Sequence, residues 1–258
     1  MTSARRFAAI DLGASGGRVM TGRWDGERFA LEERHRFGNG PVVVAGRWHW
    51  DALRLWSEMV TGLAAVGADG GGAPASIGID TWGVDFALLD RDGRLLGNPY
   101  HYRDRRTDGL PAVVEGLVPP DELWEVTGAG TLQINTLFQL YAMVRSGDPA
   151  LAAASRLVPI PNLFGTWLGG EPVAEYTHAS TSQCLDARRR DWATGLLERL
   201  AIPTGILPPL VTPGTAIGRL RDDVTGEAGL GGPGARRATA ERTGSDPTRS
   251  TSAAAPGA

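Results

Sequence analysis

A glycine-rich turn between two apolar segments near the start of the chain constrains the fold more than any other feature. Residues 6–12 and 18–24 have the composition of short strands, and they flank the turn Gly13-Ala14-Ser15-Gly16-Gly17. A second turn at Asp25-Gly26 leads into residues 28–37, which predict a third strand. Three consecutive strands with tight connections predict a β-meander at the start of the fold.

A helix and a buried strand are predicted next, at residues 51–66 and 75–80. Asp51 is placed to cap the start of the helix. The apolar residues that recur on one face of this helix are Leu53, Trp56, Val60 and Leu63 or Ala64. Residues 86–89, followed by an Asp92-Gly93 turn, predict a hairpin. The order strand, strand, strand, helix, strand indicates a mixed α/β fold.

The pattern downstream is mostly helical. Helices are predicted at residues 121–126, 135–145, 149–154, 162–168 and 191–200, and a strand at residues 156–160. In the last of these helices we expect Leu196, Leu197 and Leu200 on the buried side. Regularly spaced apolar residues continue to about Leu220.

The composition changes after residue 220. Residues 221–258 contain no aromatic residue, and Val224 and Leu230 are their only large aliphatic residues. Such a segment buries too little apolar surface to offset the entropy lost on ordering. We therefore expect one domain over residues 1–220 and a disordered tail over residues 221–258.

The bulk composition is that of an ordinary globular protein, with 258 residues, 42% of them hydrophobic and 21% charged. The formal net charge is −3 and no long stripe of Arg occurs, which argues against a nucleic-acid partner. No run approaches the roughly 20 apolar residues that span a bilayer, and the first residues lack a signal-peptide pattern. We therefore expect no membrane partner and a cytoplasmic location, and the sequence leaves the oligomeric state open.

Residue types that are missing or scarce exclude several chemistries. The sequence contains no lysine, which a P-loop, a protein kinase and a Schiff-base enzyme each require. The single cysteine, Cys184, allows neither an internal disulfide nor a cysteine-based zinc site, and we expect it to be a small buried residue. The four histidines show no pair at helical ligand spacing, so a histidine metal site is not expected.

The first candidate site is the glycine-rich turn with the aspartate that precedes it. Asp11 ends a predicted strand, where its carboxylate suits Mg²⁺ or the waters of Mg²⁺. The backbone N–H groups of residues 14–17 and the hydroxyl of Ser15 suit phosphate oxygens, and Arg18 adds a positive charge where lysine is missing. The alternative is a glycine-rich hairpin turn with a capping aspartate, so this loop needs a second motif to support it.

A second candidate site lies at the end of the predicted strand 75–80. It brings together two carboxylates, a hydroxyl, an indole and a glycine within six residues, Asp80-Thr81-Trp82-Gly83-Val84-Asp85. The indole offers a flat apolar face and an N–H to a sugar, and the glycine lets the main chain approach closely. The alternative is that both aspartates belong to turns and that Trp82 is a core residue.

A third polar cluster occupies residues 100–106. Arg103 and Asp104 are suited to charge-assisted hydrogen bonds with sugar hydroxyls. A solvated run of charges explains the same residues equally simply.

The first two motifs together resemble the FGGY family of carbohydrate kinases, and within it the rhamnulokinases. The resemblance rests on residues 10–20 in register with residues 77–86, and it extends over residues 7–220. Shorter similar segments are residues 102–104, 135–140, 175–177 and 213–218. The opening Asp-x-Gly loop is shared with heat-shock ATPases and actin, whereas Asp-Thr-Trp-Gly-Val-Asp is far more specific.

The resemblance implies a ribonuclease-H-like domain of the actin and hexokinase type, with a mixed sheet and flanking helices. It also implies ATP-dependent phosphorylation of the 1-hydroxyl of L-rhamnulose, with Mg²⁺, in L-rhamnose breakdown. Carried over by position, the metal residue is Asp11, and the phosphate loop consists of Ala14, Ser15, Gly16, Gly17 and Arg18. The small-molecule ketose would contact Asp80, Thr81, Trp82, Gly83, Asp85 and Arg103.

One part of the family pattern does not occur in these 258 residues. Family members are about twice as long, and a second domain carries the adenosine pocket and a catalytic aspartate in a His-Asp-Thr-Ala-Ser-like segment. We therefore expect the N-terminal, sugar-binding half of a kinase, truncated and impaired, and we assign no catalytic residue. The alternatives are a non-catalytic sugar-binding module and an inactive fragment. We hypothesise that the tail is an out-of-frame continuation, in which case another reading frame of the gene should encode the missing motif.

Overall fold

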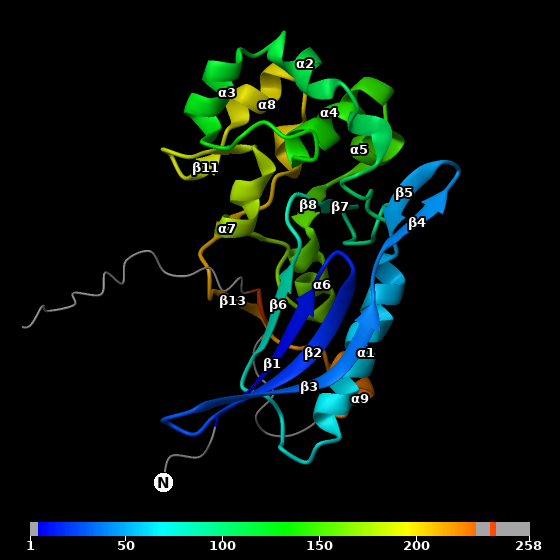
Figure 1. Ribbon diagram of the computed structural model, residues 1–258, viewed down its shortest axis with the longest axis vertical. Coiled ribbons are helices and arrows are strands. Elements are labelled where there is room, and N and C mark those ends of the chain that lie inside the picture. Colours follow the sequence, from blue (N-terminus) through cyan, green and yellow to red (C-terminus); the bar gives the residue numbers. More distant parts are fainter. Residues whose placement is uncertain (1–4, 231–237, 241–258) are drawn as a thin grey trace, which may run out of the picture.

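The computed structural model describes residues 5–230 and 238–240, which form two regions placed end to end (Figure 1). The lower region in that view is a sheet with helices against it, and the upper region is mainly helical. Strands β1 and β6 both run toward the upper region. The motifs singled out in the sequence therefore lie where the two regions meet.

The main sheet has six strands in the order β13-β14-β6-β1-β2-β3. Their bounds are β1 (Arg5–Leu12), β2 (Gly16–Trp24), β3 (Phe29–Gly38), β6 (Ile77–Thr81), β13 (Ala216–Gly218) and β14 (Ala238–Ala240). Strands β1, β2 and β3 pair antiparallel, which confirms the predicted meander, and β6 pairs parallel to β1. The parallel pairing requires a long crossover, which residues 39–76 supply.

Three helices share one core with this sheet: α1 (Ala52–Gly67), α6 (Ile160–Leu168) and α9 (Asp222–Glu227). Ile10 of β1 and its register partners Val19 and Ile79 all belong to this core. Because side chains alternate along a strand, the neighbouring residues of β1 face the other way. There Ala9 is exposed and Asp11 is half-buried, so the side chain of Asp11 lies on the face opposite this core, whereas Trp82, beyond the end of β6, packs against the core itself.

Helix α1 begins as predicted, but its buried face is rotated. The side chain of Asp51 accepts the backbone N–H of Arg54 and so caps the helix. Leu53, which was predicted to be buried, is 63% exposed. Val60 and Leu63 are buried as predicted, and the buried stripe follows Leu55, Met59 and Leu63, which recur every four residues on the side that meets the sheet.

The upper region forms a second core. Its helices are α2 (Leu110–Glu115), α3 (Pro120–Thr127), α4 (Thr136–Ser146), α5 (Pro149–Ala153) and α8 (Thr194–Arg199). The predicted helices agree with α3, α4, α5 and α8 within a few residues, and Leu196, Leu197 and Leu200 are buried as expected. Shorter elements complete the region: β9 (Ala174–Glu175), α7 (Tyr176–Ala179), β10 (Leu185–Asp186), β11 (Asp191–Trp192), β12 (Leu210–Val211) and 3-10 turns at Arg105–Thr107, Ser180–Ser182 and Thr204–Ile206.

The predicted hairpin at residues 86–89 forms, with an antiparallel bridge between Leu89 and Leu95, and its first strand also has a second partner that the sequence did not indicate. Strand β7 (Phe86–Leu89) pairs antiparallel with β8 (Arg156–Pro159), a strand far away in the sequence. The local turn does form, because the N–H of Asp90 donates to the carbonyl of Arg94 at 2.9 Å. All four residues of β7 are buried, so the distant strand adds apolar contacts to those that Leu95 and Leu96 make after the turn.

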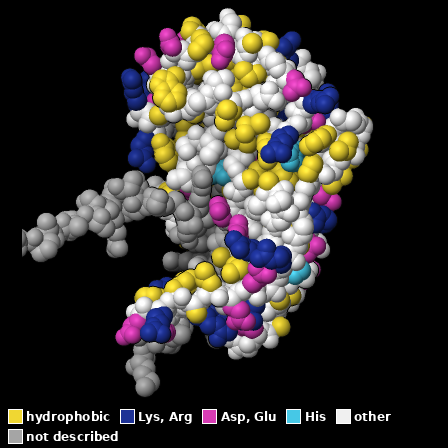
Figure 2. Space-filling model, in the orientation of Figure 1, with side chains coloured by type: hydrophobic (Ala, Val, Ile, Leu, Met, Phe, Trp, Pro, Cys, Tyr) yellow, Lys and Arg dark blue, Asp and Glu magenta, His cyan; other side chains and the backbone are white. Residues whose placement is uncertain are grey.

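A second hairpin, formed by β4 (Pro41–Val44) and β5 (Arg47–Trp50), was not anticipated from the sequence. Val42, Val43, Val44 and Trp48 are among its exposed apolar residues. Figure 2 shows hydrophobic side chains gathered over this hairpin, at the upper right of the molecule. Its importance for the site lies in Trp50, at the end of β5, which is fully buried.

Disorder was predicted from residue 221, and the structure moves that boundary. Helix α9 lies inside the expected tail, and Val224, Ala228 and Leu230 are all buried in the core of the sheet region. Residues 238–240 form β14, parallel to β6. The rest of the expected tail, at 231–237 and 241–258, lies outside the described residues. No helix in the described part of the chain is long and apolar enough to cross a membrane.

Candidate active site

The sheet places the two sequence motifs beside each other. Asp11 of β1 is the register partner of Asp80 in β6 and of Arg18 in β2. Register partners in neighbouring strands point to the same face of a sheet, so these three charged side chains form a row on the open face. The glycine-rich turn follows Asp11, and Trp82 lies two residues beyond Asp80. The turn and the segment with Trp82 thus follow the C-terminal ends of two adjacent parallel strands, as the kinase interpretation requires.

The glycine-rich turn presents only part of its length to solvent. The N–H of Gly13 donates to the carbonyl of Gly16 at 2.8 Å, which closes the turn, and Asn39 fixes it by donating to the carbonyl of Gly13. Ser15 is exposed at the tip. Gly17 is buried, and a Cβ built on it would lie 2.4 Å from the ring of Phe37. Gly17 is therefore a glycine because of packing, while the neighbouring tip is open to a ligand.

Asp11 and Arg18 form an ion pair at the open edge. The distance between Arg18 Nη2 and Asp11 Oδ2 is 2.7 Å. The side chain of Asp11 is 42% exposed and that of Arg18 is 46% exposed. Mg²⁺ in nucleotide sites is usually held by one or two carboxylates, with substrate phosphates and waters as the other ligands. In the part of the chain that the structure describes, no group of three or more potential metal ligands occurs. Asp11 with the adjacent Asp80 fits a Mg²⁺ site of one or two carboxylates completed by phosphates and waters. It does not fit a site built from protein ligands alone.

The segment after β6 makes a strained turn. Val84 has a φ of 67°, which is unfavourable for a β-branched residue. Its N–H donates to Thr181 Oγ1 at 3.1 Å, and its carbonyl accepts from Thr136 Oγ1 at 2.5 Å. A Cβ built on Gly83 would lie 3.0 Å from Thr181 Oγ1. The surrounding hydrogen bonds therefore impose this backbone shape, and such imposed strain is characteristic of functional sites.

Asp85 lies at the centre of a buried cluster of donors. Its Oδ2 accepts the indole N–H of Trp50 at 2.6 Å, the indole N–H of Trp82 at 3.0 Å and the backbone N–H of Tyr102 at 3.2 Å. Its Oδ1 accepts from Gln139 Nε2 at 2.8 Å. Burial raises the pKa of Asp85 to about 6, and the donated hydrogen bonds limit that rise.

This setting changes the roles expected for Asp85 and Trp82. Asp85 is 1% exposed, so its carboxylate does not reach the surface where a ketose would bind. The indole N–H of Trp82, which the sequence offered to sugar hydroxyls, is instead committed to Asp85. We therefore regard Asp85 as a positioning residue that fixes the orientation of the Trp82 ring.

The ring of Trp82 is the first of four stacked rings. The ring centroids of Trp82 and Trp50 are 3.9 Å apart, those of Trp50 and His101 are 4.1 Å apart, and those of His101 and Tyr102 are 4.5 Å apart. Burial lowers the pKa of His101 to about 4, so His101 is neutral within the stack at physiological pH. The stack holds Trp82 from behind while Asp85 holds it by its edge.

Arg106 balances the charge of Asp85 through an amide. Arg106 Nη2 donates to Gln139 Oε1 at 2.7 Å, and the other end of the same amide donates to Asp85. Burial lowers the pKa of Arg106 to about 10, so the guanidinium stays charged at neutral pH. Gln139 thus connects a partly buried cation to a buried anion, donating to the anion and accepting from the cation.

The polar cluster at residues 100–106 splits between these roles. Arg103 is exposed, with its guanidinium over the ring of Tyr102, and it remains available to a ligand. Asp104 is buried and accepts the backbone N–H groups of Trp48 and Arg106. Asp104 is therefore a structural residue that ties the β4–β5 hairpin to the site.

Three site residues were not assigned a role from the sequence: Trp50, Gln139 and Thr181. Trp50 and Thr181 come from segments that no motif marked. Gln139 lies in residues 135–140, which the family resemblance included without a role. A buried glutamine in an apolar helix was the available signal, because such an amide requires partners.

The fold is that of known sugar kinases. The gluconate kinase from Lactobacillus acidophilus superposes with a TM-score of 0.81 over 93% of this chain and 48% of that chain, at 16% identity. The xylulose kinase from Rhodospirillum rubrum superposes with a TM-score of 0.80 over 92% of this chain and 49% of that chain, at 18% identity. These similarities establish the actin and hexokinase type of fold, with its mixed sheet.

The sequence places the chain within that class. Residues 7–233 match the N-terminal domain of the FGGY family of carbohydrate kinases, so the chain belongs to this family. It is 41% identical over 219 residues to a rhamnulokinase of Pectobacterium carotovorum, covering 84% of this chain and 44% of the relative. It is 39% identical over 227 residues to a rhamnulokinase of Bacteroides thetaiotaomicron, covering 88% and 47%. The chain therefore spans a little under half the length of these relatives.

Proposed function

We propose that this chain forms the ketose-binding half of an ATP-dependent kinase that transfers phosphate to the 1-hydroxyl of L-rhamnulose, in L-rhamnose breakdown. The observation that carries the proposal is the parallel pairing of β1 with β6, with Asp11 opposite Asp80. It sets a turn suited to phosphates next to a strand end suited to a sugar. The similarity to rhamnulokinases supports the choice of ketose.

The roles proposed for the site residues follow from which of their groups are open to solvent. Asp11, with Asp80 beside it, holds Mg²⁺, which when bound neutralises charge on the polyphosphate. The tip of the turn, Ala14 to Gly16, offers N–H groups and a hydroxyl to the phosphates, and Arg18 adds a cation. The ketose lies against the Trp82 face and the main chain at Gly83, within reach of Thr81 and Arg103.

Neither Asp11 nor Asp85 is a suitable general base. A base must reach the hydroxyl proton directly or through one water. Asp11 is ion-paired with Arg18 at 2.7 Å, and Asp85 is enclosed by four donors. We therefore propose that these 258 residues bind L-rhamnulose and transfer phosphate to it weakly or not at all.

Calorimetric titration of the full chain tests this proposal. We expect L-rhamnulose to bind, and Mg·ATP to bind weakly and to lose affinity in Arg18→Ala. Arg23→Ala serves as the matched control, because Arg23 is another half-exposed arginine of β2 that lies away from the turn. Absence of L-rhamnulose binding would refute the proposal. L-rhamnulose 1-phosphate above background would show that the chain does contain an effective base.

A non-catalytic sugar-binding module is the second candidate. The enclosed state of Asp85 favours it, because this carboxylate then serves only to hold the Trp82 ring at the sugar surface and not to transfer a proton. The same titration separates the two candidates. A module binds L-rhamnulose but shows no Mg·ATP response that depends on Arg18.

A further inference from the structure

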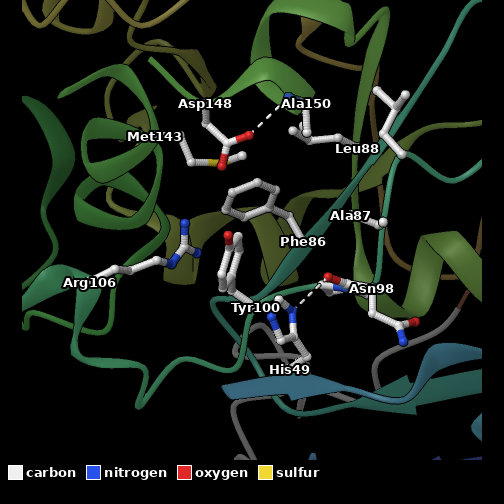
Figure 3. A pocket seen from close by; sticks show the side chains of 13 residues that line it. His49, Phe86, Ala87, Leu88, Asn98, Tyr100, Arg106, Met143, Asp148 and Ala150 are labelled. Atoms are coloured by element: carbon white, nitrogen blue, oxygen red, sulfur yellow. Dashed lines mark hydrogen bonds between the residues drawn. The ribbon is translucent and has the colours of Figure 1, made fainter. Parts of the chain in front are cut away.

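A cavity of about 260 Å³ lies beside the Asp85 cluster and shares no lining residue with the glycine-rich turn or with the Trp82 segment. It lies between β7, the segment that leads to Tyr100, and the start of α5. In the view of Figure 3, polar groups surround the ring of Phe86: Asp148 lies above it, Arg106 to the left, and Tyr100 and His49 below.

Several polar groups of this lining have free hydrogen-bonding capacity. Asp148 uses one carboxylate oxygen to accept the N–H of Ala150, which caps α5. Among the described residues, the other oxygen of Asp148, the hydroxyl of Tyr100 and Nε2 of His49 have no hydrogen-bond partner. Convergent polar groups around an apolar floor are the usual makeup of a small-molecule site.

Arg106 gives the cavity a positive wall. Its guanidinium lies over the Tyr100 ring, 4.0 Å from the centroid, and both terminal nitrogens donate to Gln139. Its Nε is buried and has no acceptor among the described residues, so the guanidinium is not fully satisfied. Through Gln139 this arginine also connects the cavity to Asp85, which orients Trp82.

The cavity is lined by one positive and one negative side chain, Arg106 and Asp148, and this pair favours a neutral ligand. An anion near Arg106 would also lie near Asp148, and a cation near Asp148 would also lie near Arg106, so either charge meets repulsion. A neutral molecule with several hydroxyls can donate to Asp148, accept from Arg106 and Tyr100, and lay its C–H side on the aromatic rings. The volume lies below the range typical of drug-sized ligands, which suits a single sugar.

We propose that this cavity, lined by Arg106, Tyr100, His49, Asp148 and Phe86, is a second binding site for a neutral monosaccharide, separate from the ketose surface at Trp82. The aldose L-rhamnose is a suitable probe, because it is neutral, polyhydroxylated and of the right size. The site lies in the sugar-binding half of the fold and uses none of the residues proposed to contact the ketose, Mg²⁺ or the phosphates, and Arg106 alone belongs to both this cavity and the network around Asp85.

Titration of the full chain with L-rhamnose tests the site. Leu96→Trp fills the cavity and should weaken L-rhamnose binding at least tenfold, whereas Leu53→Trp places the same ring on an exposed position of α1 and should leave binding unchanged. Tyr100→Phe and Asp148→Asn remove one hydroxyl and one charge, and each should weaken binding severalfold. Asp148→Asn keeps an oxygen that can accept the N–H of Ala150 and cap α5, so this variant should stay folded.

A variant of the kinase site completes the test. Gly83→Ala should weaken binding of L-rhamnulose but leave binding of L-rhamnose unchanged. The proposal would be overturned if the parent chain did not bind L-rhamnose at about 50 mM sugar, a concentration that corresponds to very weak binding. Equal binding by the parent and by Leu96→Trp, Tyr100→Phe and Asp148→Asn would also overturn it. So would loss of L-rhamnose binding in Gly83→Ala. Circular dichroism spectra of each variant confirm that it is folded.

Discussion

Two aspartates of the candidate site, Asp11 near the end of β1 and Asp85 in the segment between β6 and β7, differ in exposure and in hydrogen bonding. Asp11 is 42% exposed and has Arg18 as its ion-pair partner. Asp85 is 1% exposed and accepts four hydrogen bonds from indole, amide and backbone N–H groups. The turn after Asp11 has an open tip, whereas the segment before Asp85 is held in a strained shape by Thr181 and Thr136.

The difference in exposure indicates different roles: Asp11 is suited to bind a ligand, and Asp85 is suited to position other residues. An exposed carboxylate with a flexible partner can exchange that partner for a metal or a phosphate at little cost, because surface ion pairs contribute little. A buried carboxylate that satisfies four donors cannot be removed without leaving those donors unpaired. We therefore expect changes at Asp11 to affect ligand binding, and changes at Asp85 to affect the fold first and the sugar surface with it.

Removal of the two carboxylates should give the largest contrast. Asp85→Ala leaves four buried donors without an acceptor and should lower the free energy of unfolding by roughly 3–5 kcal/mol. Asp11→Ala removes a half-exposed ion pair and should lower it by less than about 1 kcal/mol. Urea unfolding monitored by tryptophan fluorescence measures both values. Equal destabilisation by the two substitutions would contradict the comparison.

The pH dependence of stability should isolate the same buried group. The pKa of Asp85 is raised from 3.8 to about 6 in the folded state, so between these values the folded chain holds a proton that the unfolded chain has lost. The contribution of this group to stability is therefore fully present below about pH 4 and is lost as the pH rises to about 6. The loss corresponds to about 3 kcal/mol, because each pKa unit is worth about 1.4 kcal/mol.

The control for this measurement is Asp85→Asn. The amide does not titrate, so its unfolding free energy should lack this downward slope, although other carboxylates contribute equally to both curves. Subtraction of the two pH profiles gives the contribution of Asp85 alone. Parallel profiles between pH 4 and pH 7 would show that the folded pKa is not raised.

A smaller effect than those at Asp85 is expected at the main chain of Gly83. Gly83→Ala places a methyl group 3.0 Å from Thr181 Oγ1 and should cost about 1 kcal/mol of stability through crowding. It should also weaken L-rhamnulose binding about tenfold, equivalent to about 1.4 kcal/mol, because the sugar approaches the same main chain. Thr181→Ser removes one of the crowded methyl groups and should restore part of the lost stability in the double variant. Unchanged stability and affinity in Gly83→Ala would place the ketose elsewhere.

Local patterns were enough to predict most individual elements. The meander, the start of α1 at Asp51 and the helices around Leu123 and Leu137 follow from turn chemistry, capping and apolar spacing. The errors have a common cause, because each depends on contacts between distant segments. Strand β7 pairs with the distant β8 in addition to its predicted local partner, Leu53 faces solvent, and α9 is ordered because Val224 and Leu230 pack into a core formed by other elements.

The candidate site shows the same division. The sequence alone determined which residue types are present at the two motifs, since a glycine-rich turn after Asp11 and an indole beside a glycine at residue 83 are local features. The tertiary structure decided what those residues do. Asp85 became a buried positioning group because Trp50, Tyr102 and Gln139 converge on it from three separate segments, and burial and hydrogen-bond satisfaction depend on those distant neighbours.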